Sequence, residues 1–407
     1  MEASAESAAA RQRGSAGEVF LAALRLGLTS FGGPIAHIGY FRREYVERRR
    51  WLDEAHFADL VALCQSLPGP ASSQLGIAIG TGRAGLAGGL AAWLGFTLPS
   101  AAVLIGLGLY ASQVDLASAG WVHGLKLAAV AVVALAVFTM ARSLTPDWPR
   151  RAVAVAALIV ALLITTPFTQ LALIAAGALL GYLFLAAPPA PADVAEVSPV
   201  PARLGVALIG LFFALLVALP IAAAVTGSSA VAQFQGMYGS GALVFGGGHV
   251  VLPLLHATTV DHGWVTDSQF LAGYGATQAV PGPLFTFAAF LGTVSSVPPA
   301  GVLGGLTSLV AIFLPAFLLI WGTLPLWDRL RRWDSFRRAL SGTNAAVVGL
   351  LGAALYNPVW TGSVSSLIDV AIVVAALALL ATRRVAPIVV VALCAVAGQL
   401  LTGPRLL

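Results

Sequence analysis

The sequence predicts an all-α polytopic membrane protein with an inverted internal repeat and re-entrant helical hairpins. Three observations predict it. First, 58% of the 407 residues are hydrophobic and 10% are charged, whereas a soluble domain carries about 25% charged residues. Second, nine segments are long and apolar. Third, four further apolar regions are interrupted by glycine and proline, in two matching pairs. This composition excludes a cytosolic enzyme, a disordered chain and a coiled coil.

Taken in order, the chain begins with a polar tail, 1–16, that lacks the apolar core of a signal peptide. A spanning helix needs about 20 apolar residues, which sets the candidate spans. A first transporter repeat (17–186), a proline-rich linker (187–203), a unique connecting helix (204–226) and a second, inverted repeat (230–401) are expected. The other spans are expected near 85–110, 118–140, 151–166, 168–186, 300–325, 338–357, 364–382 and 385–401.

Four interrupted regions complete the pattern: 17–50, 54–82, 230–262 and 267–293. Glycine and proline stop a helix and leave backbone groups unpaired. In a bilayer this is tolerated only where protein or a wet cavity supplies partners. The interruptions are named the first to fourth breaks; they are Phe31-Gly32-Gly33-Pro34, Pro68-Gly69-Pro70, Phe245-Gly246-Gly247-Gly248 and Pro281-Gly282-Pro283.

The breaks reveal a duplication. Phe31 and Phe245 are 214 residues apart, and Gln65 and Gln278, which each stand three residues before a Pro-Gly-Pro, are 213 apart. The same order continues with Leu98-Pro99 and Leu314-Pro315, which are 216 residues apart, and with Gly124-Leu-Lys126 and Gly342-Thr-Asn344, which are 218 apart. Paired interrupted segments in two halves are the best sequence pointer to a transporter binding site.

The arginines indicate the topology, because positive charge marks the cytoplasmic side. If each interrupted region enters and returns as a hairpin, 19 of the 21 arginines fall on one side, with a cytoplasmic N-terminus. The rival is a chain of about thirteen full crossings. Cysteine labelling at position 46 separates the two. The net charge of +5 is explained by this excess of arginine on the cytoplasmic side. Nucleic acid is therefore not an expected partner.

A helix N-terminus follows each break, and its free N–H groups and positive dipole end favour an anion. Ser72 and Ser73 follow the second break, and Thr286 follows the fourth. The glycines expose the backbone to a ligand, or serve helix packing instead. Gln65 and Gln278 either bind substrate or brace the unwound backbone.

Ionisable groups inside apolar segments are costly and usually functional. Arg25, six residues before the first break, either neutralises a bound anion or extends to the headgroups. Lys126 either attracts anions or extends outward, and Asn344 is its counterpart. Asp59 is the candidate for proton coupling, whereas acidic neighbours such as Glu44 pair with arginines on a solvated face. His249 follows the third break and titrates near a ligand or is structural.

No metal site, cofactor site or catalytic motif is expected. The histidines lack ligand spacing beside a carboxylate, and no phosphate-binding, dinucleotide or nucleophile motif occurs.

Several of these motifs resemble the chromate ion transporter family. They are Phe31-Gly-Gly-Pro-Ile-Ala-His37, Gln65-Ser-Leu-Pro-Gly-Pro70 and Leu98-Pro-Ser100, with Phe245-Gly-Gly-Gly-His249 and Gln278-Ala-Val-Pro-Gly-Pro283 in the second half. The match covers both repeats, as in the two-domain members of the family. Arg25 and Lys126 match the family's basic positions. The second half has Gly239 and Asn344 there, so a symmetric site is not expected.

The resemblance implies export of chromate, a tetrahedral dianion like sulfate, across the bacterial plasma membrane. The membrane potential, proton coupling or both would drive it. The alternatives are a transporter or channel for sulfate or another tetrahedral oxyanion, and a membrane-embedded enzyme. The expected partners are the anion and the lipid bilayer. GxxxG-like spacings such as Gly177 and Gly181 are compatible with a homodimer, although packing within the chain explains them better.

Overall fold

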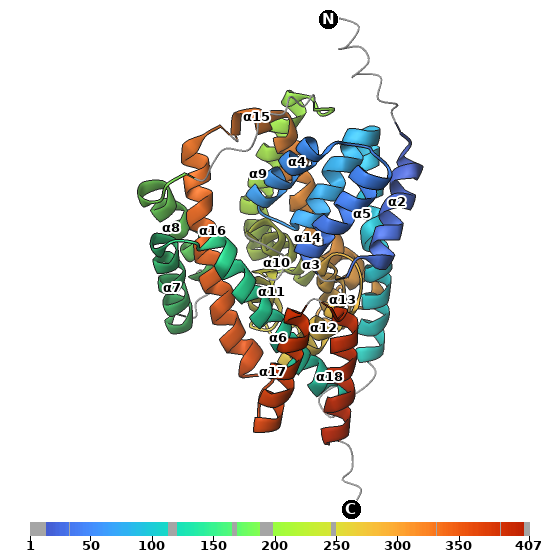
Figure 1. The fold of residues 1–407 in the computed structure, drawn as a ribbon, viewed down its shortest axis with the longest axis vertical. Helices are drawn as coiled ribbons and strands as arrows, with labels where there is room; N and C mark the ends of the chain where they lie inside the picture. Colours follow the sequence, from blue (N-terminus) through green and yellow to red (C-terminus); the bar gives the residue numbers. More distant parts are fainter. Residues whose placement is uncertain are drawn as a thin grey trace, which may run out of the picture.

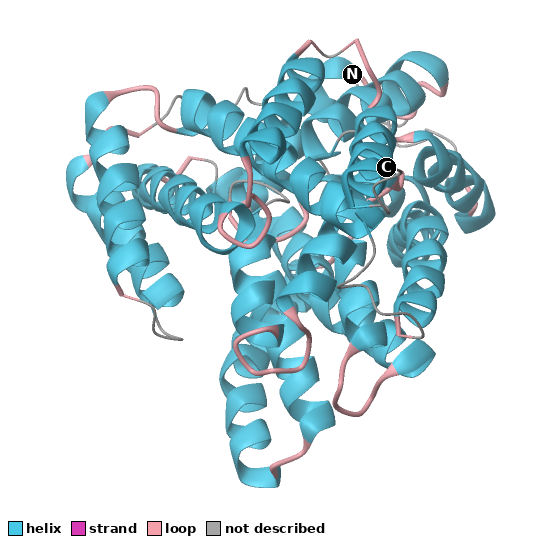
Figure 2. Cartoon of the chain, turned by 90° about the horizontal axis from the view of Figure 1, so that it is seen from below, coloured by secondary structure: helices cyan, strands magenta, loops and turns pink. Residues whose placement is uncertain are grey.

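The structure is a computed structural model that describes residues 14–31, 33–112, 120–164, 169–187, 198–245, 250–330, 332–382 and 384–402. In this described part every regular element is a helix, and Figure 2 shows helices joined by loops. The all-α prediction is confirmed. Small and aliphatic side chains fill the interior, with larger aromatic residues such as Phe287 and Phe313 fully buried.

The first half contains α2 (Ala16–Thr29), α3 (Gly33–Phe41), η1 (Arg42–Arg48), α4 (Glu54–Ser66), α5 (Ala71–Ala111), α6 (Gly120–Leu144), α7 (Trp148–Leu163) and α8 (Thr169–Phe184). The connecting helix is α9 (Ala202–Thr226). Helix α5 is kinked at Ala84 and Gly85, so it combines the return arm of the second hairpin with a span.

The second half repeats this order, with short insertions between the helices. It contains α10 (Ser229–Ala242), α11 (Val251–Thr259), α12 (Asp267–Ala279), η3 (Leu284–Thr286), α13 (Phe287–Val294), α14 (Gly301–Thr323), η4 (Leu324–Leu326), α15 (Trp327–Leu330), α16 (Asp334–Ala354), η5 (Leu355–Trp360), α17 (Leu367–Ala381) and α18 (Pro387–Thr402). Both α4 and α12 have 13 residues.

Within the part of the chain that the structure describes, five helical segments are long and apolar enough to cross a membrane: α5, α6, α9, Gly301–Leu330 and Asp334–Trp360. All nine predicted spans exist as helices. However, α7 and α8 have 16 residues each, α17 has 15 and α18 has 16. Such a helix rises about 24 Å, less than the ~30 Å hydrocarbon core. Nine full spans therefore stay a prediction.

Each interrupted region folds back on itself. In the first half, Glu18 near the start of α2 lies 3.9 Å from Arg49 after η1 and 3.3 Å from Arg83 at the end of the return arm. In the second half, the Ser229 hydroxyl donates to Pro298 O (2.7 Å) and Ser296 N–H donates to Trp264 O (2.9 Å). The start, the middle turn and the end of each hairpin pair therefore lie at one end of the bundle.

The two halves exchange helices. The first-half α6 packs on α17 and α18, and the second-half α16 packs on α7 and α8; Figure 1 shows α7, α8 and α16 together on one flank. Glycines make both contacts close: Gly124 lies against Cys394 O, and Gly342 lies against Gly177 O and Gly181. Gly177 and Gly181 thus pack within the chain, as the packing interpretation predicts.

The arginine-bearing ends of several helices lie close together. The Arg150 guanidinium at the start of α7 donates to Ser341 Oγ (2.6 Å) and to Ala186 O (3.0 Å), which follows α8. The indole N–H of Trp327 in α15 donates to Asp59 in α4 (3.1 Å). In Figure 1, α4 and α15 lie at the top, and α17 and α18 lie at the bottom.

Candidate functional site

The four breaks meet in two equivalent pairs. The Gly282 N–H in the fourth break donates to Ser30 O (3.0 Å), and the Gly69 N–H in the second break donates to Val244 O (2.6 Å). Ser30 and Val244 occupy matching positions directly before the first and third breaks, and Gly69 and Gly282 are the central glycines of the two Pro-Gly-Pro turns. Each half therefore supplies the donor that the other half's broken helix needs.

Both central glycines have a backbone conformation that other residues rarely adopt. The φ angle is +120° at Gly69 and +113° at Gly282. A Cβ atom on Gly282 would lie 2.7 Å from Ser100 Oγ in α5, and one on Gly69 would lie 3.0 Å from Gln74 Nε2. Glycine is therefore required at Gly282 by the backbone and by the close approach of α5.

The two pairs border the same stretch of α14. The ring of Phe313 lies 5.9 Å from that of Phe285, which follows the fourth break. Its neighbour Ile312 contacts Gly241, near the end of α10 and close to the third break. Contacts with α14 thus bring the two pairs of breaks to the centre of the described fold.

Four helices begin at these breaks: α3, α5, α11 and the η3–α13 segment. Ser73 lies in the first turn of α5; its side chain is buried and its Oγ has no partner among the described residues. Ser72 is buried beside it. Thr286 differs, because its hydroxyl donates to Pro283 O (2.7 Å). Its role in the structure is to brace the turn.

The remaining break residues are only partly described. Phe31, Gly33 and Phe245 are half-buried, and Pro34 lies in the first turn of α3. Pro68 and Pro281 are half-buried, whereas Pro70 and Pro283 are buried. The predicted site residues Gly32, Gly246, Gly247, Gly248 and His249 lie outside the described residues.

Arg25 lies away from the central contacts. Its side chain is 57% exposed, and its Nη1 lies 3.9 Å from Glu44 Oε2. Arg48 and Arg49 also bind Glu44, at 2.9 and 2.7 Å. Glu44 is buried, contrary to the prediction of a solvated face, because its own segment η1 folds back toward α2, and three arginines compensate its charge.

Lys126 and Asn344 also lie apart from the breaks. The Lys126 ammonium donates to Ser268 Oγ (2.9 Å) at the start of α12. The fourth break follows the other end of this 13-residue helix, about 20 Å away at ~1.5 Å per residue. Asn344 lies on α16, where its Oδ1 is buried without a partner among the described residues.

The two glutamines and Asp59 are placed differently. Gln65 is exposed, whereas the Gln278 Nε2 is buried without a partner in the described part of the chain. Asp59 is buried in α4 and accepts a hydrogen bond from the Trp327 indole (3.1 Å).

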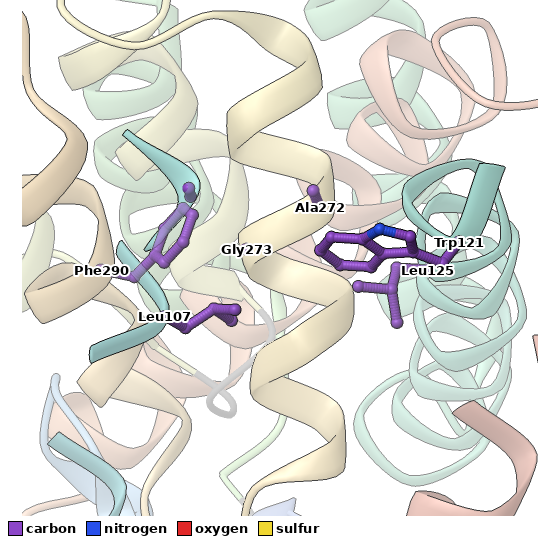
Figure 3. A pocket seen from close by; sticks show the side chains of 7 residues that line it. Leu107, Trp121, Leu125, Ala272, Gly273 and Phe290 are labelled. Atoms are coloured by element: carbon purple, nitrogen blue, oxygen red, sulfur yellow. The ribbon is translucent and has the colours of Figure 1, made fainter. Parts of the chain in front are cut away.

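A small pocket occupies the matching place, between α5 and α6 of the first half and α12 and α13 of the second (Figure 3). At the positions matching Asp59 and Trp327 it has the smaller residues Ala272 and Ala111, so the space is not filled. Its lining is wholly apolar: Leu107, Ala111, Trp121, Leu125, Ala272, Gly273 and Phe290. Such a lining offers a dianion no compensating group.

The sequence interpretation did not assign a role to several central polar residues. Ser30 and Thr97 are buried with unpartnered hydroxyls. Gln74 donates to Pro68 O (2.8 Å) and so braces the second break. The sequence does contain a pattern that points to these residues. Thr97 and Ser100 flank the Leu98-Pro99 pair, and Gln74 is a polar residue in an apolar helix, one turn after Pro70.

The comparisons with known proteins agree with one another. The sequence profile of the family described as "Chromate transporter" matches residues 17–182 and 231–399. The chain is 32% identical to the chromate transport protein of Pseudomonas aeruginosa over 83% of this chain and 79% of that protein. It is 30% identical to the probable chromate transport protein of Synechococcus elongatus (73% and 72%) and 26% identical to the chromate transport protein of Cupriavidus metallidurans (82% and 80%).

No solved structure matches the chain significantly. The profile covers both halves and leaves out only the tail, the linker region with α9 and the C-terminus. This family indicates a transporter rather than an enzyme, and the apolar helices are those of a multi-pass membrane protein. The chain belongs to the chromate transporter family.

Proposed function

We propose that the protein is a secondary transporter that exports chromate from the cytoplasm across the bacterial plasma membrane. The observation that carries this proposal is the meeting of four helix breaks, two from each half, joined by two equivalent hydrogen bonds. Helix N-termini at interrupted helices are a recurrent way to bind an anion inside a membrane. The names of the relatives, which are chromate transport proteins, indicate that this anion is chromate.

The breaks then lie near the bilayer midplane, with each half contributing two re-entrant hairpins in inverted orientation. The folded-back contacts of Glu18 with Arg49 and Arg83 support hairpins. The arginine-rich η1 and the arginine-bearing ends of α7, α15 and α16 would face the cytoplasm. The equivalent turns of the second half, near Trp264 and Ser296, would face outward.

Export of a dianion from a negative-inside cell needs no nucleotide. The membrane potential contributes about 2.3 kcal/mol per charge per 100 mV, or about 4.6 kcal/mol for two charges. Proton coupling through Asp59 is the second possible drive. Sulfate is the alternative substrate, because hydroxyl and backbone donors recognise a tetrahedral oxyanion rather than its central atom.

The test is uptake of radiolabelled chromate into energised everted membrane vesicles, with and without excess sulfate. Vesicles from empty-vector cells are the control. We expect saturable uptake above the control and inhibition by sulfate. Absence of uptake with the protein inserted and folded would reject chromate export. Conduction that does not saturate would indicate a channel instead.

A further inference from the structure

The two halves place different side chains at matching positions around the breaks. Ser30, Ser73 and Thr97 in the first half correspond to Val244, Thr286 and Phe313 in the second, by the offsets of 213 to 216 residues that relate the two halves. Further pairs differ in the same sense: Ser72 with Phe285, Gln74 with Phe287, and Ser100 with Ala316. In five of these six pairs an apolar side chain of the second half replaces a polar one of the first, whereas Ser73 and Thr286 both carry a hydroxyl.

The first-half hydroxyls are buried and unsatisfied. Ser30, Ser73 and Thr97 are 0%, 2% and 1% exposed. Their hydroxyl oxygens have no partner among the described residues. A buried hydroxyl without a partner costs stability. Three such groups beside the breaks of one half indicate that a ligand satisfies them in another state of the protein.

The contacts place these groups on one side of the central region. The Ser30 carbonyl binds Gly282, and Gly282 approaches Ser100, one turn beyond Thr97 on α5. Ser73 lies on the return arm of α5, where Gly76, one turn later, contacts Phe41 of α3. Phe41 in turn packs on Phe96, with 5.1 Å between the two ring centroids, and Phe96 directly precedes Thr97. Helices α2, α3 and both arms of α5 therefore enclose this side.

The opposite side is mainly aromatic. Phe285, Phe287 and Phe313 are buried, and the Thr286 hydroxyl is already bound to Pro283 O. These four residues form a wall that offers packing without free donors, although the Gln278 Nε2, three residues before the fourth break, is buried without a partner among the described residues.

The charge of a dianion is matched without a buried cation. Of the described residues that are buried, none is lysine or arginine. Each helix N-terminus carries about +0.5 elementary charge. Helix α5 holds Ser73 in its first turn and α3 begins three residues after Ser30, so positive helix ends lie beside these hydroxyls, and the neutral hydroxyls add hydrogen bonds that are readily broken on release.

Resting on the proposed function, we infer that the chain holds one tetrahedral-oxyanion site, not two symmetric ones, and that the hydroxyls of Ser30, Ser73 and Thr97 bind the anion there. The second half contributes its helix ends and the aromatic wall.

The first experiment compares Thr97→Val with Thr323→Val in purified protein. Both remove a buried threonine hydroxyl at nearly constant volume, but the Thr323 hydroxyl is bonded to Leu319 O in its own helix (2.7 Å). Thr97→Val should weaken chromate binding and raise the KM of uptake about tenfold or more. Its melting temperature without ligand should be unchanged or higher, because an unsatisfied group is removed. Thr323→Val should bind chromate normally.

Ser73→Ala and Ser30→Ala should behave like Thr97→Val, and calorimetric titration of the wild type with chromate should give one site per chain. Two equivalent sites, or normal binding by all three hydroxyl variants, would overturn the inference. A hydroxyl variant that loses stability and binding together would show a structural role and also reject it. Wild-type uptake is measured first, so that its absence rejects chromate export and not merely this site.

Discussion

Replacing Gly282 by alanine tests whether the paired breaks have the geometry described here. The φ angle of +113° costs a residue with a Cβ about 1–3 kcal/mol. The new Cβ would also lie 2.7 Å from Ser100 Oγ and 3.2 Å from Ser100 Cβ. Overpacking of this kind costs about 1–3 kcal/mol more. The total is therefore about 2–6 kcal/mol of folding stability.

Gly69→Ala is the matched comparison. It meets a similar φ of +120°, but its Cβ would approach the end of the Gln74 side chain at 3.0 Å, which can move. We expect only the backbone cost of about 1–3 kcal/mol. Ser100→Gly should relieve part of the Gly282→Ala defect and none of the Gly69→Ala defect.

Thermal unfolding in detergent and chromate uptake in vesicles are the two assays. Gly106→Ala is the control. Gly106 lies on α5, as Ser100 does, and a Cβ atom added there meets nothing within 4 Å. Alanine in place of glycine also stabilises a helix by about 0.5–1 kcal/mol. If Gly282→Ala were as stable and active as this control, or if Ser100→Gly rescued both glycine variants equally, the reasoning about the breaks would be refuted.

Three further predictions address charge, coupling and topology. Arg25→Ala should raise the KM for chromate. The difference from wild type should shrink as the salt concentration rises, since the charge of a side chain that is 57% exposed is screened by salt. Complete loss of uptake at all salt concentrations would instead place Arg25 at the bound anion, which is one of the two roles that the sequence predicts. Asp59→Asn should abolish any stimulation of uptake by a pH gradient. Trp327→Phe, which removes the hydrogen bond to Asp59 and part of a buried ring but keeps the carboxylate, should preserve the stimulation. Equal stimulation in wild type and Asp59→Asn would exclude Asp59 from coupling. A cysteine in place of the exposed Arg43 should be labelled from the cytoplasm, and one in place of the exposed Asp261 should be labelled from outside. Labelling is measured in intact cells and in everted vesicles. Labelling of both positions from the same side would contradict inverted halves.

The choice of Arg43 rather than position 46 follows from the structure. Val46 is buried, so a cysteine there would label poorly whatever the topology. The native thiols, Cys64 and Cys394, are also buried. The sequence shows an arginine-rich stretch around position 46 but not which of its side chains turns inward, because η1 is wound as a π-helix and changes the facing of its residues.

The sequence predicted the helices, the four breaks and the constant offset between halves, because glycine and proline act locally and hydropathy needs no tertiary information. It did not predict which way the Arg25 side chain points. That depends on Glu44, which lies 19 residues away and becomes buried only when the hairpin folds back. The exchange of helices, with α6 on α18 and α16 on α8, was equally invisible, because matching positions within one half say nothing of contacts between halves.

That exchange makes each half dependent on the other. The carbonyls of the buried residues Ser30 and Val244 end broken helices and need donors, and each finds its donor in the opposite half, from Gly282 and Gly69. The chain cut between 187 and 198 should therefore transport chromate when both pieces are made in one cell, and neither piece alone should insert stably. Co-purification of the pieces and vesicle uptake are the measurements. A first half that is stable and active by itself would show that its breaks are satisfied without the second, and would remove the basis for one shared site.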